Sequence, residues 1–313
     1  MTSTTPTAEP KRDFLRVTDL DRSELLELVA RAAEWKLLGK AGPRPLDGAT
    51  VGLVFEKAST RTRVSFHVAA SQLGGDSIML SPRDTQLGRG EPIKDTARVL
   101  SRYLDCLVVR TFEHEKIVEM ARWASVPVVN ALTDSSHPCQ VLADLLTLAE
   151  RFGSDALARG SLRVAWVGDG NNMANSWLEA CALLGFELRL ACPEGYDPDP
   201  ALVARTGGRA RVVRAPREAV EGAHVVNTDV WASMGQEGEA EQRRAAFAGF
   251  LVDDALLAAA RPDAIVLHCL PAHRGEEISE ALMEGPRSAI FDQAENRLHA
   301  QKALLELLVA ARR

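Results

Sequence analysis

The sequence lacks a long hydrophobic run: no apolar stretch in its 313 residues approaches the roughly 18 residues that a membrane-spanning helix needs. It also lacks an excess of positive charge, because its 37 lysines and arginines are fewer than its 43 aspartates and glutamates, which gives a formal net charge of −6. A chain without a global positive field is poorly suited to hold a polyanion. We therefore expect neither a membrane protein nor a nucleic-acid-binding protein.

Cysteine is scarce, and its pattern excludes two kinds of small scaffold. An odd, scattered set without a CxxC pair argues against a disulfide framework and a zinc ribbon, and it is typical of a reducing compartment. The first 12 residues are rich in threonine and proline and show no targeting pattern. We therefore expect a cytoplasmic protein with a disordered tail over residues 1–12. The five cysteines are Cys106, Cys139, Cys181, Cys192 and Cys269.

Short strand-like runs alternate with helical patterns along the whole chain, whose length suits about two domains. The runs at residues 106–109 and 126–129 are apolar throughout, as expected for parallel strands that are covered on both faces. A short polar segment at residues 153–160 separates two such series. This pattern predicts an α/β fold of two doubly wound parallel-sheet domains. We place the first domain at residues 13–152 and the second at residues 153–292, with a C-terminal helix, residues 293–313, packing back onto the first.

Local signals predict where two helices begin. Asp21 and Glu24 form a capping-box pattern in front of the helical run at residues 22–35. The last helix is predicted over residues 293–311, so that Asn296 and Arg297 stand at its opening.

Ligands of open parallel sheets bind beyond the carboxyl ends of the strands, so the loops that follow strands are the places to search. The first strand leads into a helix start that carries Ser59, Thr60, Arg61, Thr62 and Arg63. Backbone N–H groups at a helix start and guanidinium forks both bind phosphate oxygens. A capped helix with solvated arginines explains this segment equally well when it is taken alone.

Two further strand ends carry polar residues of the same kind. Arg110 directly follows the strand at residues 106–109, and His137 and Gln140 stand at the start of the next long helix. Residues three apart lie on one face of a helix, so His137 and Gln140 can face one ligand. A surface salt bridge and a helix cap are the plainer explanations of each piece. Together the three strand ends favour a small phosphorylated substrate and an active site in the interdomain cleft.

Metal binding is a competing interpretation of the same loops. The chain offers residues of the type that bind zinc, but none of them has CxxC or HxxxH spacing, so we expect no metal site. These residues are His137, Cys139, His268, Cys269, His273 and His299.

The second series contains a glycine pattern that resembles a dinucleotide-binding turn. Gly168 and Gly170 follow a strand, but Met173 occupies the position of the third glycine of the fingerprint. Glu194 lies about where a ribose-binding acid could sit. A nicotinamide-dependent dehydrogenase therefore remains an alternative, ranked second.

Eight ordered motifs resemble those of the carbamoyltransferases, and among them those that use ornithine. The motifs span nearly the whole chain after residues 1–12. They are STRTR at 59–63, QLGRGE at 86–91, RTF at 110–112, HPCQ at 137–140, GDGNN at 168–172, DVWASMGQE at 229–237, HCLP at 268–271 and AENR at 294–297.

The resemblance implies transfer of a carbamoyl group from carbamoyl phosphate to the δ-amine of L-ornithine, giving L-citrulline and phosphate, without a metal or an organic cofactor. It also implies a homotrimer or a multiple of trimers, with Gln86 reaching in from a neighbouring subunit. Carbamoyl phosphate would be bound by Ser59, Thr60, Arg61, Thr62, Gln86, Arg110, His137, Gln140, Cys269, Leu270 and Arg297. Ornithine would be bound by Asn172, Asp229, Ser233 and Met234, and the catalytic residues would be Arg61, Arg110, His137, Asp229 and Cys269.

The identity of the acceptor rests on the loop that begins at Asp229. A relative that uses aspartate needs cationic groups for a dicarboxylate, whereas this loop offers a carboxylate suited to an α-ammonium group. Putrescine and N-acetylornithine stay open as alternative acceptors.

Overall fold

The computed structural model describes residues 11–57, 59–81, 90–232 and 237–312. The chain forms two compact units. Unit 1 consists of the described residues of Met1–Leu15, Arg31–Asp134 and Leu298–Arg313, and unit 2 consists of those of Arg16–Ala30 and Ser135–Arg297. Helices α1 (Arg22–Leu38) and α13 (Ile290–Val309) contribute residues to both units. Among the described residues, none of the helices is long and apolar enough to cross a membrane.

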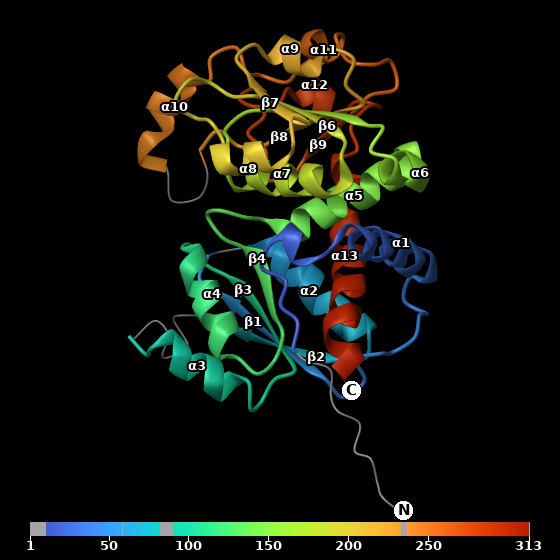
Figure 1. Cartoon of the computed structure of the whole chain (residues 1–313), viewed down its shortest axis with the longest axis vertical. Helices are drawn as coiled ribbons and strands as arrows, with labels where there is room; N and C mark the ends of the chain where they lie inside the picture. The colour runs from blue at the N-terminus through green and yellow to red at the C-terminus, as the bar shows by residue number, and fades with distance from the viewer. Residues whose placement is uncertain (1–10, 58, 82–89, 233–236, 313) are drawn as a thin grey trace, which may run out of the picture. The chain divides into compact units, whose positions relative to one another are not determined.

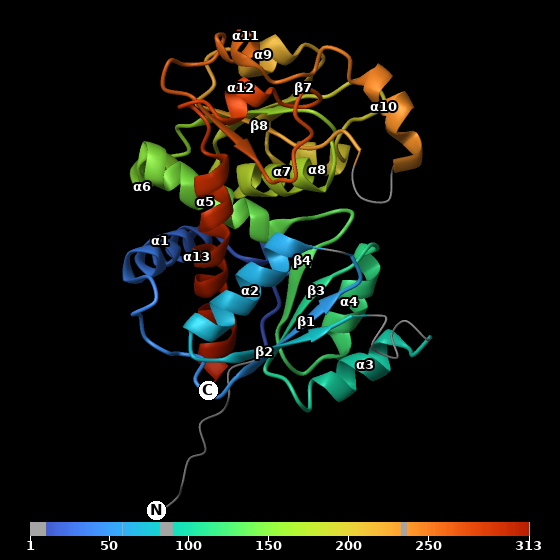
Figure 2. The same cartoon turned by 180° about the vertical axis from the view of Figure 1, so that it is seen from behind.

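Unit 1 is built around a four-stranded parallel sheet in the order β2-β1-β3-β4. Helices α3 and α4 lie on one side of this sheet, and α2 and the C-terminal part of α13 lie on the other (Figures 1 and 2). The elements are β1 (Thr50–Phe55), α2 (Thr60–Gln72), β2 (Asp76–Leu80), α3 (Ile93–Leu100), β3 (Cys106–Arg110), α4 (His114–Trp123) and β4 (Val128–Leu132).

The inner strands of unit 1 are buried because helices cover both of their faces. All five residues of β3 are buried, which agrees with the apolar run at residues 106–109, and the strand extends one residue further than predicted, to Arg110. The strand predicted at residues 126–129 is wrong in its bounds, since β4 begins at Val128. Pro127 has no N–H group for the ladder and only accepts, through its carbonyl, from Leu107. Phe14 extends the sheet beside β4 by pairing with Val129.

Unit 2 contains a five-stranded parallel sheet in the order β7-β6-β5-β8-β9. Helices α5, α7 and α8 lie on one side of it, and α9, α11 and α12 lie on the other (Figures 1 and 2). The strands are β5 (Arg163–Val167), β6 (Glu187–Ala191), β7 (Ala210–Val213), β8 (Val225–Thr228) and β9 (Ile265–His268). The helices are α5 (Pro138–Phe152), α6 (Ser154–Ala158), α7 (Asn172–Leu184), α8 (Pro200–Arg205), α9 (Pro216–Val220), α10 (Ala240–Ala246), α11 (Asp254–Leu257) and α12 (Glu280–Met283), with 3-10 turns at η1 (Val17–Asp19), η3 (Glu237–Glu239) and η4 (Ala310–Arg312).

The prediction of two doubly wound parallel sheets is confirmed, and each sheet has one point where its strand order reverses. In unit 1 this point lies between β1 and β3, and in unit 2 it lies between β5 and β8. Ligands of such sheets bind beyond the carboxyl ends of the strands at the reversal. The topology therefore directs attention to the loops after these four strands.

One of the two predicted helix starts is confirmed and the other is wrong. Asp21 and Glu24 exchange hydrogen bonds between side chain and backbone, each 2.9 Å long, in a capping box. The last helix begins at Ile290, because the N–H of Gln293 already donates to the carbonyl of Ala289 at 2.8 Å. Asn296 and Arg297 therefore lie inside α13 and do not open it.

Candidate active site

The reversal point of unit 1 gathers hydroxyl groups and guanidinium groups at the start of α2. Ser59 caps this helix, since its hydroxyl accepts from the N–H of Thr62 at 3.3 Å. Arg110, the last residue of β3, pairs with Phe55 of β1. Its Nη1 lies 3.5 Å from the Thr62 hydroxyl, at the long end of the hydrogen-bonding range. The predicted anion-binding residues of unit 1 are therefore neighbours.

Arg61 adds a donor that the described protein groups do not satisfy. Its Nε is buried and has no hydrogen-bond partner among the described residues. A buried donor that lacks a partner calls for an explanation, because such groups are rare in folded proteins. A phosphate oxygen beside the start of α2 would satisfy this donor and the dipole of the helix together.

Lys57 is a buried cation at the same loop that sequence reasoning missed. Its Nζ donates to Asp134 at 2.6 Å and lies 4.0 Å from the ring centroid of Phe112. Because Asp134 balances its charge, we do not count Lys57 among the groups that attract an anion.

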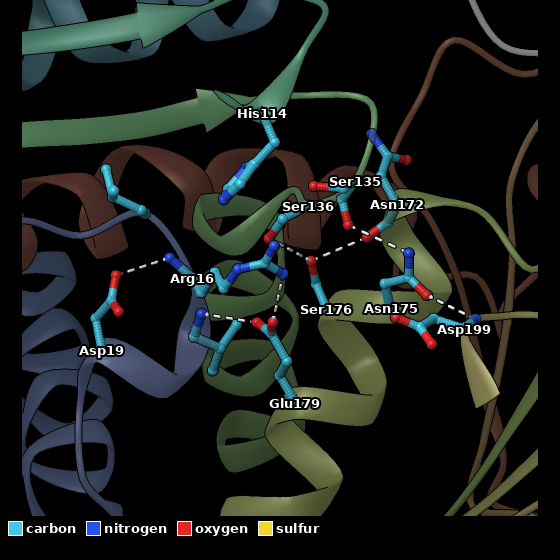
Figure 3. A network of polar contacts seen from close by, with 12 residues as sticks. Arg16, Asp19, His114, Ser135, Ser136, Asn172, Asn175, Ser176, Glu179 and Asp199 are labelled. Atoms are coloured by element: carbon cyan, nitrogen blue, oxygen red, sulfur yellow. Dashed lines mark hydrogen bonds and ion pairs between the residues drawn. The ribbon is translucent and has the colours of Figure 1, made fainter. Parts of the chain in front are cut away.

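In unit 2, the first turns of α7 hold the loop that leads into α5 (Figure 3). The hydroxyl of Ser176 donates to the carbonyl of Asn172 at 2.9 Å and accepts from the N–H of His137 at 2.8 Å. Asn175 donates through its amide to the carbonyl of Ser135 at 3.2 Å. The predicted residues Asn172 and His137 are thereby connected through one side chain.

The ends of strands β5, β8 and β9 meet at a second set of hydrogen bonds. Asn171 caps α7 by accepting from Met173 and Ala174, and its amide donates to Asp229 at 3.0 Å. The other carboxylate oxygen of Asp229 accepts from the thiol of Cys269 at 3.0 Å. Asp229 and Cys269, predicted as catalytic, are therefore in direct contact at the reversal point of unit 2.

The glycine pattern after β5 is explained by packing. A Cβ atom on Gly170 would lie 2.1 Å from the nitrogen of Pro198, so only glycine fits this close approach. Asp169 forms a buried ion pair with Arg243, with Nη1 and Oδ2 2.8 Å apart. Neither residue requires a dinucleotide to account for it.

The segment after β9 has an unusual backbone that is held from within unit 2. Leu270 has a φ of 60°, a left-handed conformation that side chains other than glycine rarely adopt. Its N–H donates to Nδ1 of His268 at 2.8 Å, so the proton of this imidazole is on Nε2. Nε2 lies 3.2 Å from a carboxylate oxygen of Glu277, and both side chains are fully buried. This pair holds Leu270 in position.

Within the described part of the chain, two groups of residues place metal-ligand atoms within 4.8 Å of one another. In the first group both ring nitrogens of His268 already take part in hydrogen bonds, so a metal ion there would have to break one of them. The groups are Asp229, His268 and Cys269, and His273, Glu276 and Glu277.

Helices α5 and α13 bring further predicted residues into the cluster of unit 2 that contains Cys269. Gln140 donates to Asp144 at 2.9 Å, and Gln293 donates to the same oxygen at 2.6 Å. Burial raises the pKa of Asp144 to about 7, and the positive charge of Arg297 acts against this shift. Arg297 likewise opposes the rise that burial causes in the pKa of Cys269. Arg297, Gln140 and Cys269 therefore belong to one cluster in unit 2.

Sequence reasoning missed Asp144 and Gln293. Both side chains are fully buried. Asp144 interrupts an otherwise apolar part of its helix, which was the available signal in the sequence. Of the other predicted site residues, Gln86, Ser233 and Met234 lie outside the described residues.

The environment of Cys269 keeps its thiol protonated. Burial raises the pKa of the thiol well above its ordinary value, and the adjacent carboxylate of Asp229 raises it further. The thiol therefore acts as a hydrogen-bond donor to Asp229, and it is poorly suited to act as a nucleophile at neutral pH.

Under the activity that the resemblance of the motifs implies, replacing Cys269 by serine should weaken ornithine binding and leave carbamoyl phosphate binding nearly intact. A hydroxyl prefers a shorter hydrogen bond than the 3.0 Å of this contact, so it displaces Asp229. We expect the ornithine KM to rise about tenfold, as for about 1.4 kcal/mol lost at a hydrogen bond to a charged group. Kinetics and calorimetry with carbamoyl phosphate measure the two effects.

Cys181→Ser is the matched control, because that buried thiol donates to the carbonyl of Phe186 and does not contact Asp229. Its ornithine KM should stay close to that of the unchanged protein. Loss of carbamoyl phosphate affinity in Cys269→Ser, with an unchanged ornithine KM, would overturn the role of Cys269 in ornithine binding.

Comparisons with known proteins agree over nearly the whole chain. Residues 12–150 match the family described as "Aspartate/ornithine carbamoyltransferase, carbamoyl-P binding domain", and residues 161–308 match its "Asp/Orn binding domain". A Pseudomonas aeruginosa protein named "Ornithine carbamoyltransferase, anabolic" is 58% identical over 300 residues, which are 95% of this chain and 97% of that protein. The solved ornithine carbamoyltransferase of Thermus thermophilus is 44% identical with a TM-score of 0.88, over 96% of this chain and 100% of the other. The one from Pyrococcus furiosus is 44% identical with a TM-score of 0.90, over 97% and 98% of the two chains.

Proposed function

The chain belongs to the aspartate/ornithine carbamoyltransferase family, and from this premise we propose that it transfers the carbamoyl group of carbamoyl phosphate to the δ-amine of L-ornithine. The products are L-citrulline and phosphate. The observation that carries the choice of acceptor is the buried carboxylate of Asp229 at the reversal point of unit 2. A carboxylate there suits the α-ammonium group of an amino acid and repels a dicarboxylate.

We propose that carbamoyl phosphate is held mainly through its phosphate and carbonyl oxygens. The unsatisfied Nε of Arg61 and the capped start of α2 support this assignment in unit 1. The cluster around Arg297 supports it in unit 2. The proposed residues are Ser59, Thr60, Arg61, Thr62, Gln86, Arg110, His137, Gln140, Cys269, Leu270 and Arg297.

We propose that ornithine is held by residues that follow strands β5 and β8. Asn172 stands at the start of α7, where the capping side chain of Asn171 reaches across to Asp229. The thiol of Cys269 fixes the other oxygen of the same carboxylate. The proposed residues are Asn172, Asp229, Ser233 and Met234.

In the proposed mechanism the neutral δ-amine attacks the carbamoyl carbon, an oxyanion develops, and phosphate leaves. Arg61, Arg110 and His137 stabilise the developing charge and the leaving group, which is electrostatic preorganisation. Asp229 and Cys269 steer the amine, and the departing phosphate accepts its proton. Because phosphate is itself a good leaving group, the reaction as written requires no metal and no organic cofactor.

Activity should rise with pH above neutrality. The attacking amine has a lysine-like pKa near 10.4, so its deprotonation at pH 7 costs roughly 4–5 kcal/mol. Below that pKa the neutral fraction of ornithine grows about tenfold per pH unit. We expect kcat/KM for ornithine to climb between pH 7 and 9 in steady-state assays, and a flat profile between pH 6 and 9 would contradict the mechanism.

The experiment that tests the function is a citrulline colour assay with several acceptors side by side. With carbamoyl phosphate present, ornithine should be carbamoylated, while putrescine, N-acetylornithine and aspartate should give at most traces of product. Turnover of another amine in place of ornithine would show that the enzyme uses a different acceptor from the one proposed.

We further propose that the enzyme works in the cytoplasm, in the anabolic direction of arginine biosynthesis, and as a homotrimer or a multiple of trimers. The five cysteines all lie within the described residues and form no disulfide bond, which fits a reducing compartment. The Pseudomonas aeruginosa relative is named anabolic. Light scattering should give a mass that is a multiple of three times the 34.0 kDa of one chain, and a monomeric mass would contradict the trimer.

A further inference from the structure

A buried carboxyl group connects two parts of unit 2 that are far apart in the sequence. Asp144 lies on α5, one turn after Gln140, and its side chain is fully buried. A single oxygen, Oδ1, accepts from the amide of Gln140 at 2.9 Å and from the amide of Gln293 at 2.6 Å. Asp144 therefore joins α5 to α13.

The connection continues from Gln293 to the strand end that precedes Cys269. The side-chain oxygen of Gln293 accepts from the backbone N–H of His268 at 2.9 Å. A backbone N–H can only donate, so the carbonyl of this amide must face His268 and its NH2 group must face Asp144. The orientation of Gln293 is thereby fixed at both ends.

We propose that Asp144 is a positioning residue for carbamoyl transfer. By accepting both amides it fixes Gln140 relative to the backbone of His268, and therefore relative to the adjoining Cys269 and Leu270. The inference rests on the proposed function, in which Gln140 and Leu270 hold the same substrate.

The chemistry of the position supports a specific task for the carboxyl group. The neighbouring residues of α5 are buried and apolar, and a buried ionisable group is costly unless it is hydrogen-bonded. Burial raises the pKa of Asp144 to about 7; the positive charge of Arg297 acts to lower this pKa and the negative charge of Asp229 acts to raise it. An apolar side chain would fill this space without that cost, so packing alone does not explain an aspartate here.

The packing of α5 against α13 also has a polar contact that does not involve Asp144. One turn further along, Asn296 donates to the hydroxyl of Thr147 at 3.0 Å and to Glu150 at 2.7 Å. Thr147→Val removes this hydroxyl from the same pair of helices and leaves Gln140 and Gln293 untouched. It is therefore the matched control for loss of helix packing.

The test compares full-length Asp144→Ala, Asp144→Asn and Thr147→Val by melting temperature and by steady-state kinetics with both substrates. We expect Asp144→Ala to lower kcat/KM for carbamoyl phosphate at least about thirtyfold, because small misplacements of catalytic groups cost up to about a hundredfold. Asp144→Asn should stay within about threefold of the unchanged enzyme, since its carbonyl oxygen can accept from both amides. Thr147→Val should melt earlier and keep its kinetics within about twofold.

Three results would overturn the inference. The first is an Asp144→Ala enzyme that melts earlier but has the kinetics of Thr147→Val, and the second is an Asp144→Asn enzyme as impaired as Asp144→Ala. If Asp144→Ala does not fold, Gln293→Met replaces it, because that change removes the link to His268 and keeps Gln140 bonded to Asp144. Unimpaired kinetics of Gln293→Met would then be the third. An unchanged protein that makes no citrulline would contradict the proposed function itself, which separates the two failures.

Discussion

Replacing Arg61 by lysine is expected to lower kcat/KM at least about a hundredfold, as for the loss of one oxyanion-stabilising donor. The guanidinium group presents planar, paired donors that match phosphate oxygens, whereas an ammonium group is a point charge on a flexible stem. The Nε that lacks a described partner in the folded chain would have no counterpart in lysine. Steady-state kinetics with carbamoyl phosphate as the varied substrate measure the effect.

Arg63→Lys is the matched control for this change. Arg63 lies on the same helix, two residues further on, and its side chain is exposed. Its kinetics should therefore remain close to those of the unchanged enzyme. Equal losses in the two variants, or near-normal kinetics of Arg61→Lys, would remove Arg61 from the site.

Replacing Arg243 by methionine should destabilise the protein by about 3–5 kcal/mol, because it leaves a buried charge without its partner. Arg243 donates from Nη1 to Asp169 and to the carbonyl of Trp231, at 2.8 Å in both cases, and its guanidinium lies 5.0 Å from the ring centroid of Tyr196. Urea denaturation measures the loss as a lower midpoint. Arg244→Met is the control, since its ion pair with Glu276 is exposed and should contribute at most about 1 kcal/mol.

The loss of unfolding free energy in Arg243→Met should be smaller at low pH than at high pH. Burial raises the pKa of Asp169, and Arg243 opposes this rise. Without Arg243 the folded state holds the proton of Asp169 more tightly than the unfolded state does, so stability falls as pH rises. The loss of unfolding free energy should therefore be smaller at pH 5 than at pH 8. A loss that is larger at pH 5 would contradict the proposed role of the ion pair between Arg243 and Asp169.

Much of the fold follows from local patterns that the sequence displays directly. The apolar run at residues 106–109 predicted a covered parallel strand, and the pair of Asp21 and Glu24 predicted a helix start. The hydroxyl residues after the first strand predicted a helix start, and in the structure Ser59 caps that helix. Each of these signals acts over a few residues, which is why the sequence alone could reveal it.

The remaining features depend on contacts between residues that are far apart in the chain. Asp144 and Gln293 are separated by 149 positions, so no local pattern relates them. Gly170 is required because Pro198 approaches it, and that approach is visible only in the fold. Residues 59–63 taken alone support an anion site and a solvated helix start equally well, and only the two further polar strand ends favoured the anion site.

The hydroxyl of Ser176 affects how the two reactants are positioned relative to each other. It ties the helix start at Asn172 to the loop that carries His137, and both ends belong to unit 2. Under the proposed function these ends serve the acceptor and the donor of the carbamoyl group. The separation between the groups that hold the two reactants is then set within unit 2 when the protein folds, so these protein groups need little further ordering when the reactants bind.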